Sequence, residues 1–384
     1  MKQHSPDTEP RASASGQPRK SCLFLTPEKP ALAQGGGALR SQSLLKYLQQ
    51  SYEVEVVTFQ LREHSRSFSA KLSRNAARLV RRKPPLFDRY SGYEDQIQSS
   101  LQALHYDVAV VEHFWCASYA TLLRPLCDRL VVDLHNIESE LARSHARAVT
   151  GPTKWAAGQF ANMYAELERE WLPKFDTLLV ASQADRARVE HHDIRVFPNA
   201  IPEVPAPIVE EQNAVVFSGN LEYHPNVEAV RWFAQEVWPR LSQRLSEAEW
   251  RLIGRNPEAV AGLVQALPHV SLTGPVEDAI EALAHGRVCV VPLLSGSGTR
   301  FKILEAWAAQ RAVVSTTIGA EGLGARDGEH LLIADDANAF VDAVVQLWND
   351  PDLRHRLASA GHELYLRKFT WPAAWRQLDD QGGL

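Results

Sequence analysis

The distribution of apolar residues along the chain predicts a repeating succession of strands and helices. From Cys22 onward, short apolar runs of strand-forming residues alternate with amphipathic stretches of roughly 10 to 15 residues, which is typical of parallel sheets covered by helices. The first half predicts strands at Cys22–Thr26, Val54–Phe59, Val108–Glu112, Leu130–Leu134, Thr177–Ser182 and Arg195–Phe197. The second half predicts strands at Val215–Gly219, Arg251–Gly254, Ser271–Gly274, Val288–Leu293, Ala312–Thr316 and Leu331–Ala334, and helices at Asn226–Leu245 and Phe301–Ala309. Two doubly wound α/β domains are the simplest arrangement, with ligands between the carboxyl ends of the strands.

Interruptions of this pattern predict where the domains begin and end. A chain of 384 residues exceeds what one hydrophobic core usually serves, so we expect two domains. Residues 201–213 are proline-rich and contain little that could pack, which is typical of a linker. The expected domains are therefore residues 21–200 and 214–368. Residues 1–20 are polar and lack the apolar run of a secretory signal, so they predict a disordered tail.

Composition and charge narrow the classes of partner. The net charge of -5 gives no general electrostatic reason to bind nucleic acid, and we expect none as a partner. No run of about 18 apolar residues occurs, so the sequence predicts no transmembrane helix. The cysteines lie in or beside apolar runs without the paired spacing of a metal site, and we expect reduced thiols in a cytosolic core at Cys22, Cys116, Cys127 and Cys289.

A strongly basic segment spans residues 62–89, where nine basic residues stand against Glu63 and Asp88. Such a segment can lie on an anionic membrane, with electrostatics worth about 1 kcal/mol per well-placed cation. A solvated helical face or a loop that recognises an acceptor would have the same composition. Both interpretations stay open at the level of sequence.

Three glycines follow the first predicted strand and precede a helical pattern. Gly35, Gly36 and Gly37 would let backbone N–H groups approach an anion closely, and the start of the helix adds partial positive charge. A flexible turn would use the same residues. The run does not match G-x-G-x-x-G, so a dinucleotide site, and with it a dehydrogenase, is not predicted.

The densest functional pattern is VVPLLSGSGTRFKILEAW. The small-residue loop Ser295–Thr299 follows a buried strand, and the glycines before the next helix are typical of a phosphate cradle. Arg300 and Lys302 place two cations in the first turn, where the helix dipole disfavours positive charge by a few tenths of a kcal/mol, so an anionic ligand is indicated. Glu305 lies among apolar residues, and ribose hydroxyls would be suitable donors to its carboxylate. Solvated surface side chains are the alternative that needs no ligand.

These motifs together resemble a known family. The stretches GSGTRFKILEAWAAQRAVVST, GAEGL, FSGNLEYHPNVEAVRWF, GGGALR and DLHNIES resemble the retaining glycosyltransferases of family 4, which have the GT-B fold. The resemblance extends from Cys22 to the C-terminus, with the motifs in the same order. It implies two Rossmann-like domains that face each other across a cleft, and a C-terminal helix, residues 369–384, that crosses back to the first domain. Trp371 and Trp375 share one face of that helix and would be packing residues.

The resemblance also implies roles for individual residues. His135 is expected beside the donor sugar, and Arg300 and Lys302 are expected on the donor diphosphate, which makes these three the expected catalytic residues. Glu305 resembles the ribose-binding glutamate of the family. The other donor-binding residues expected are Gly36, Gly37, Gly219, Gly298, Thr299 and Glu321. No metal site and no cofactor are expected, because the nucleotide-sugar donor is a co-substrate and GT-B enzymes as a class need no divalent ion for catalysis.

Some features depart from the family pattern. Ser297 stands where relatives often have the first of two glutamates, so a carboxylate contact to the transferred sugar is absent or supplied elsewhere. Gln310 stands where glycine usually follows the helix, and a left-handed conformation there would cost about 1 to 2 kcal/mol. The Arg or Lys that relatives usually have near the start of the second domain is not evident in SGNLEYHPN. The only Asp-x-Asp, Asp350-Pro351-Asp352, predicts helix termination and capping rather than a metal site.

The sequence therefore predicts a retaining, metal-independent glycosyltransferase. It would move a sugar from a nucleoside-diphosphate sugar to the hydroxyl of an unknown glycan, lipid-linked or small-molecule acceptor, in polysaccharide or glycoconjugate synthesis. Two alternatives stay open: a nucleotide-sugar epimerase of the same fold, and a catalytically silent nucleotide-sugar-binding protein. We expect a cytoplasmic protein, with peripheral contact at the inner face of the membrane through residues 62–89 as an option.

Overall fold

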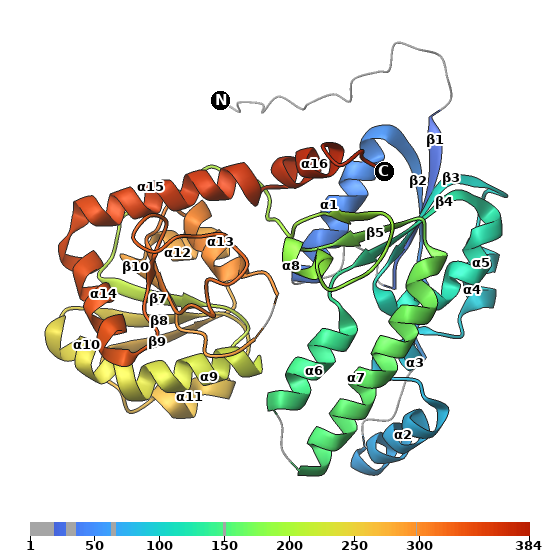
Figure 1. Cartoon of the computed structure of the whole chain (residues 1–384). Coiled ribbons are helices and arrows are strands. Elements are labelled where there is room, and N and C mark those ends of the chain that lie inside the picture. Colours follow the sequence, from blue (N-terminus) through green and yellow to red (C-terminus); the bar gives the residue numbers. More distant parts are fainter. Residues whose placement is uncertain (1–18, 28–35, 63–66, 149–150, 297) are drawn as a thin grey trace.

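The fold consists of two parallel β-sheets of six strands each, both covered by helices (Figure 1). The computed structural model describes residues 19–27, 36–62, 67–148, 151–296 and 298–384. The strand order is β2-β1-β3-β4-β5-β6 in the first sheet and β12-β11-β10-β7-β8-β9 in the second. In each sheet the chain starts at an inner strand and winds outward in both directions. This doubly wound topology confirms the predicted fold class.

The N-terminal half alternates strands with helices along the sequence. Its strands are β1 (Lys20–Leu25), β2 (Tyr52–Val57), β3 (Tyr106–Glu112), β4 (Cys127–Leu134), β5 (Thr177–Val180) and β6 (Ile194–Val196). Its helices are α1 (Gly36–Ser51), α2 (Phe68–Arg81), α3 (Pro85–Tyr90), α4 (Glu94–Ser100), α5 (Ala120–Leu123), α6 (Glu138–Ala148), α7 (Gly151–Trp171) and α8 (Gln183–Arg186).

The first sheet is buried on both faces, which explains why its strands are nearly continuous apolar runs. Successive side chains of a strand point to opposite faces. Cys22 and Phe24 of β1 therefore pack in one core with Leu44 and Leu48 of α1, whereas Leu23 and Leu25 belong to the core on the other face. All four cysteines of the chain are buried and unpaired, as the sequence predicts.

The C-terminal half repeats the same architecture around one large core. Its strands are β7 (Ala214–Ser218), β8 (Glu249–Ile253), β9 (Val270–Gly274), β10 (Val288–Val291), β11 (Val313–Ser315) and β12 (Leu332–Ile333). Its helices are α9 (His224–Trp232), α10 (Trp238–Arg244), α11 (Glu258–Val264), α12 (Ala279–Ala284), α13 (Phe301–Ala308), α14 (Ala337–Asn349) and α15 (Pro351–Lys368).

The last helix, α16 (Trp371–Asp379), returns to the N-terminal half (Figure 1). Trp371 is buried in the core that α1 covers, and Trp375 Nε1 donates a hydrogen bond of 3.1 Å to the carbonyl oxygen of Ser43. The predicted crossing and the packing role of both tryptophans are confirmed. The segment between the two sheets is tied to the same place, since Ile201 pairs with Thr370 in an isolated bridge.

Every predicted strand is present, with ends displaced by up to three residues; the largest displacement is at the start of β4. The predicted helix Asn226–Leu245 is interrupted, because a π-helical turn, Phe233–Val237, separates α9 from α10. Pro239 explains the interruption, since it lies in the first turn of α10 and has no N–H to donate to the preceding turn. Among the described residues, no helix combines the length and apolarity needed to cross a membrane.

Two local predictions at helix ends are confirmed. Gln310, directly after α13, has a φ of 52°, the left-handed conformation that glycine adopts at no steric cost. Asp350 caps α15 by accepting a hydrogen bond of 2.9 Å from the Leu353 backbone N–H, with Pro351 as the first residue of the helix. The Asp-x-Asp sequence therefore serves helix capping.

Candidate functional site

His135 lies directly beyond β4, beside the N-terminus of α1. Its side chain is almost fully buried. The ring atom Nδ1 lies 3.5 Å from the position that a Cβ atom on Gly37 would occupy, so the absence of a side chain at Gly37 leaves the space beside the ring open. Gly36 and Gly37 form the first turn of α1, whose N–H groups and dipole favour an anion. The structure thus brings together His135 and the glycines expected from the sequence.

Two carboxylates at the ends of neighbouring strands face the His135 ring. His135 Nε2 lies 3.3 Å from Asp133 Oδ2 and 3.4 Å from Glu112 Oε1. Asp133 also accepts two hydrogen bonds from Arg40 Nε, at 2.9 and 3.0 Å, and one from Arg40 Nη2 at 2.5 Å. Burial raises the pKa of Asp133, but Arg40 and His135 outweigh it and hold the pKa below its ordinary value.

His113 extends this cluster into a stack of rings. Its ring lies 3.7 Å from the His135 ring and 4.2 Å from the Trp115 ring, between centroids, and is nearly parallel to Trp115. His113 has a φ of 64°, which is uncommon for a residue with a side chain and typical of functional loops. Burial and the neighbouring His135 hold the pKa of His113 well below its ordinary value, so its imidazole is neutral.

A chain of hydrogen bonds connects this cluster with the loop before α13. Arg40 Nη1 donates to the carbonyl oxygen of Phe197 and, at 3.2 Å, to Asn199 Oδ1. Asn199 Nδ2 in turn donates to Thr299 Oγ1 at 2.8 Å. Thr299 was expected at the donor, and Asn199 belongs to the N-terminal half. The contact brings the two halves of the chain together at the expected site.

Arg300 is the N-cap residue of α13 and is buried, unlike an ordinary surface cation. Its Nε donates to the carbonyl oxygen of Ile318 at 3.1 Å, and its Nη2 donates to that of Gly296 at 3.0 Å. Nη2 also lies 3.6 Å from Glu321, whose side chain is 68% exposed. Burial lowers the pKa of Arg300 from its usual value. Arg300 therefore connects the loop before α13 with the loop after β11, and it also supplies positive charge.

Lys302 lies against the carboxyl end of β7. Its Nζ is 5.2 Å from the centre of the Phe217 ring and would be 2.5 Å from a Cβ atom on Gly219, which has a φ of 147°. Only glycine at position 219 leaves room for this ammonium group. Burial lowers the pKa of Lys302 to about 8, against the opposing effect of Glu305. A bound anion would stabilise the charged form.

Glu305 lies one turn beyond Lys302 on the same helix. Burial raises its pKa to about 7, although Lys302 lowers it. Ionisation of this buried carboxylate is costly, and a ligand that donates hydrogen bonds to it would stabilise the ionised form. Gly298, with a φ of 88°, needs the conformation that only glycine adopts readily. Ser297 and Gly35 lie outside the described residues.

Glu112, Asp133 and His135 are the one group of three potential metal-ligand side chains that meets among the described residues, with ligand atoms within 4.8 Å of one another. Asp133 is already engaged by Arg40 on both of its oxygens. Arg40 balances the charge of one carboxylate, and an imidazolium at His135 would balance the other, so the cluster can be neutral without a further ion. We therefore assign no metal to these residues.

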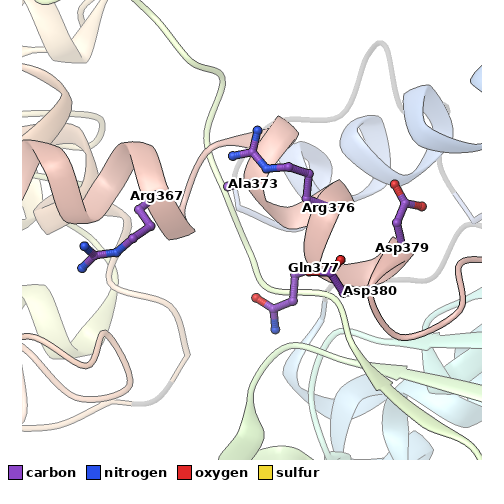
Figure 2. A pocket seen from close by; sticks show the side chains of 6 residues that line it. All are labelled: Arg367, Ala373, Arg376, Gln377, Asp379 and Asp380. Carbon is purple, nitrogen blue, oxygen red and sulfur yellow. The ribbon is translucent and has the colours of Figure 1, made fainter.

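A pocket lies beside α16 (Figure 2). Its lining residues come from α15, from α16 and from the residue that follows α16, and they are Arg367, Ala373, Arg376, Gln377, Asp379 and Asp380. None of the candidate site residues lines it. We assign this pocket no role in donor binding.

The basic segment 62–89 is largely helical, and several of its cations are paired. Asp88 lies 2.9 Å from Arg78 Nε and 3.6 Å from Arg81 Nη1, and Glu166 of α7 accepts a hydrogen bond of 2.5 Å from Arg82 Nη2. These pairs are compatible with the interpretation as a solvated helical face. Arg66 lies outside the described residues.

Comparison with known proteins identifies the family. A model described as Glycosyltransferase Family 4 matches residues 34–203, and one described as Glycosyl transferases group 1 matches residues 212–350. The chain is a family 4-like glycosyltransferase. A segment of 152 residues, 37% of this chain, is 31% identical to phosphatidyl-myo-inositol mannosyltransferase of Mycobacterium leprae and covers 40% of that protein. The chain spans less than half of the length of the curated relatives it matches.

Solved structures of the same architecture confirm the GT-B fold of this chain. Sucrose-phosphate synthase from Thermosynechococcus elongatus aligns with a TM-score of 0.70 and 16% identity, covering 94% of this chain and 98% of that protein. HepE of Anabaena, solved in complex with UDP and glucose, aligns with a TM-score of 0.59 and 14% identity over the same shares of both chains. At these identities the likeness establishes the fold alone.

Sequence reasoning missed four polar residues that organise the site. Glu112 was assigned only as the end of a strand, and Arg40, Asp133 and Asn199 were not singled out. A charged residue that closes an apolar run, as Glu112 and Asp133 do, is the pattern that could have indicated them, since such a residue is costly to bury without a partner.

Proposed function

We propose that this protein transfers a sugar from a nucleoside-diphosphate sugar to an acceptor hydroxyl, with retention of configuration and without a metal ion. The observation that carries the proposal is the chain of hydrogen bonds from Arg40 of α1 through Asn199 to Thr299, which connects the helix whose N-terminus lies beside His135 with the loop that leads into Arg300 and α13. Helix N-termini and buried cations together suit a diphosphate.

The positive groups support a reaction in which charge grows on the leaving diphosphate. Arg300 and Lys302 are held in place by packing before any ligand binds, so they need little reorganisation during the reaction. They supply the charge that a divalent ion supplies in other phosphate sites, which supports the metal-independent part of the proposal.

The carboxylates near His135 support a direct transfer on one face of the sugar. Asp133 and Glu112 are fully buried, and Asp133 is held by Arg40, so neither is presented as a covalent nucleophile. The acceptor hydroxyl would then attack from the side that the diphosphate leaves. HepE, solved with UDP and glucose, is a structural neighbour that suggests uridine diphosphate as the first nucleotide to test.

The test combines ligand binding with transfer. Thermal shift against a panel of nucleotides and nucleotide sugars should reveal the donor, because a ligand at 100 times its Kd adds about 2.7 kcal/mol of stability. Incubation of that donor with candidate polysaccharide or lipid-linked acceptors should then yield a glycosylated product. Proton NMR of the product should show the anomeric configuration of the donor, and EDTA should leave the rate unchanged.

Each alternative function gives a different result in the same assay. Conversion of the donor sugar in the absence of any acceptor would point to an epimerase, and tight donor binding without transfer or hydrolysis would point to a silent binding protein. An inverted product would overturn the retaining mechanism while leaving transfer intact.

The proposal includes a cytoplasmic location and peripheral contact with the inner face of the membrane. Near the end of α2, Val80 is 84% exposed and is followed by the exposed cations Arg81, Arg82 and Lys83. Sedimentation should show binding to vesicles that contain phosphatidylglycerol, weakened by salt, and none to pure phosphatidylcholine vesicles. Equal behaviour with both vesicle types, or no effect of the double variant Arg81→Glu/Lys83→Glu, would remove the membrane contact.

A further inference from the structure

Two carboxylates are fully buried at the carboxyl ends of β3 and β4, and their partners differ. Asp133 accepts hydrogen bonds from Arg40, whereas neither oxygen of Glu112 has a hydrogen-bond partner among the residues that the structure describes. A buried carboxylate without a compensating charge is costly. Glu112 therefore requires a cation close by.

His135 is the group placed to supply that cation. Its Nε2 lies 3.4 Å from Glu112 Oε1 and 3.3 Å from Asp133 Oδ2. Arg40 balances one of the two negative charges, and an imidazolium at His135 balances the second. The other titratable groups that face the ring are His113, whose stacked ring must stay neutral beside a charged neighbour, and Glu138 at the start of α6.

We propose that Glu112 is a positioning residue that keeps His135 protonated and turns its Nδ1–H toward the N-terminus of α1. Nδ1 lies beside Gly37, at the helix end where the proposed function brings the donor, so a charged N–H there can donate to the sugar or the diphosphate. The hydrogen bond from Nδ1–H to the donor rests on the proposed function, whereas the protonation of His135 does not.

The expected pH dependence follows from the neighbours of the ring. Burial lowers the pKa of His135, but the carboxylates of Asp133 and Glu112 outweigh it and raise the pKa above its ordinary value. The imidazolium is therefore present below that raised pKa and lost as the pH rises through it. Replacing Glu112 by glutamine removes one of the two raising charges, so His135 should lose its proton at a lower pH.

The first experiment is an NMR titration of the unliganded protein labelled with 13C at histidine Cε1. The His135 signal is assigned as the one missing from the His135→Gln variant. In the wild type it should titrate above the ordinary histidine range, and in Glu112→Gln its midpoint should move to lower pH. The matched control is Glu168→Gln, because Glu168 is a partly buried glutamate that accepts a hydrogen bond from the Ser139 N–H, and its replacement should leave the midpoint unchanged.

The second experiment is a pH profile of transfer. At pH values where His135 of the Glu112→Gln variant is neutral, kcat should be about tenfold below that of the wild type. At lower pH the kcat of the variant should recover toward the wild-type value, and KM for the donor should stay nearly unchanged. A purely structural role would not be rescued by acid. A neutral His135 in the wild type, or a midpoint that Glu112→Gln does not move, overturns the inference even where transfer occurs. A protonated His135 in a protein without transferase activity overturns the proposed function alone.

Discussion

Replacing Lys302 by alanine is expected to lower kcat by about 100- to 1,000-fold, the usual effect of removing one preorganised group that stabilises transition-state charge. Its ammonium group is packed against Phe217 and Gly219, and the carboxylate that raises its pKa is that of Glu305 on its own helix. The fold should persist. Burial of the charged ammonium group costs free energy, and the Lys302→Ala variant no longer carries this cost. Steady-state kinetics with the identified donor give the measurement.

Arg300→Ala should lower turnover to a similar extent, but it also removes the hydrogen bonds to Ile318 and Gly296 and should lower the melting temperature. Lys302→Ala is the cleaner variant for that reason. Lys368→Ala is a suitable control, because Lys368 is an exposed lysine of the same half at the end of α15. A rate near wild type in Lys302→Ala would remove the diphosphate role of this residue.

Replacing Arg40 by alanine is expected to destabilise the N-terminal half by about 3 to 5 kcal/mol, the usual cost of leaving a buried charge without its partner. The guanidinium binds Asp133, Phe197 and Asn199, so its loss leaves one buried carboxylate and two acceptors unsatisfied. Calorimetry should show the transition of the N-terminal half at a markedly lower temperature.

Two further variants make this stability test specific. Arg240→Ala removes an exposed arginine that pairs with Glu236 one turn away, and should change stability by less than about 1 kcal/mol. In the double variant Arg40→Ala/Asp133→Asn the uncompensated charge is gone, so part of the loss should be recovered. Equal effects of Arg40→Ala and Arg240→Ala would show that the buried pair does not hold the site together.

The fold was predictable because both sheets are buried on two faces. A strand such as β1, with Cys22 and Phe24 in one core and Leu23 and Leu25 in the other, must be apolar throughout, and that run is visible in the sequence. The π-helical turn before α10 was missed, since Pro239 fits a helix start as well as a helix interruption. The left-handed Gln310 was anticipated from its place after α13.

The sequence indicates candidate site residues where charged groups are concentrated in a short segment, as at Arg300, Lys302 and Glu305, and the role of these three stays a prediction. The site was not predictable where one residue owes its role to a partner far along the chain. Arg40 and Asp133 are 93 positions apart, and Asn199 meets Thr299 across 100 positions. The apolar run that Glu112 closes indicates that its carboxylate needs a partner, but not which residue that partner is. Only the tertiary structure shows that its carboxylate faces His135.

The central claim is that the two halves of this protein hold one diphosphate between the N-termini of α1 and α13. A crystal structure with a bound nucleoside diphosphate tests it most directly. We predict phosphate oxygens within hydrogen-bond distance of Lys302 Nζ and of the Gly37 backbone N–H, with the ribose on Glu305. A diphosphate bound elsewhere, with Lys302 and Gly37 still unliganded, would contradict the account.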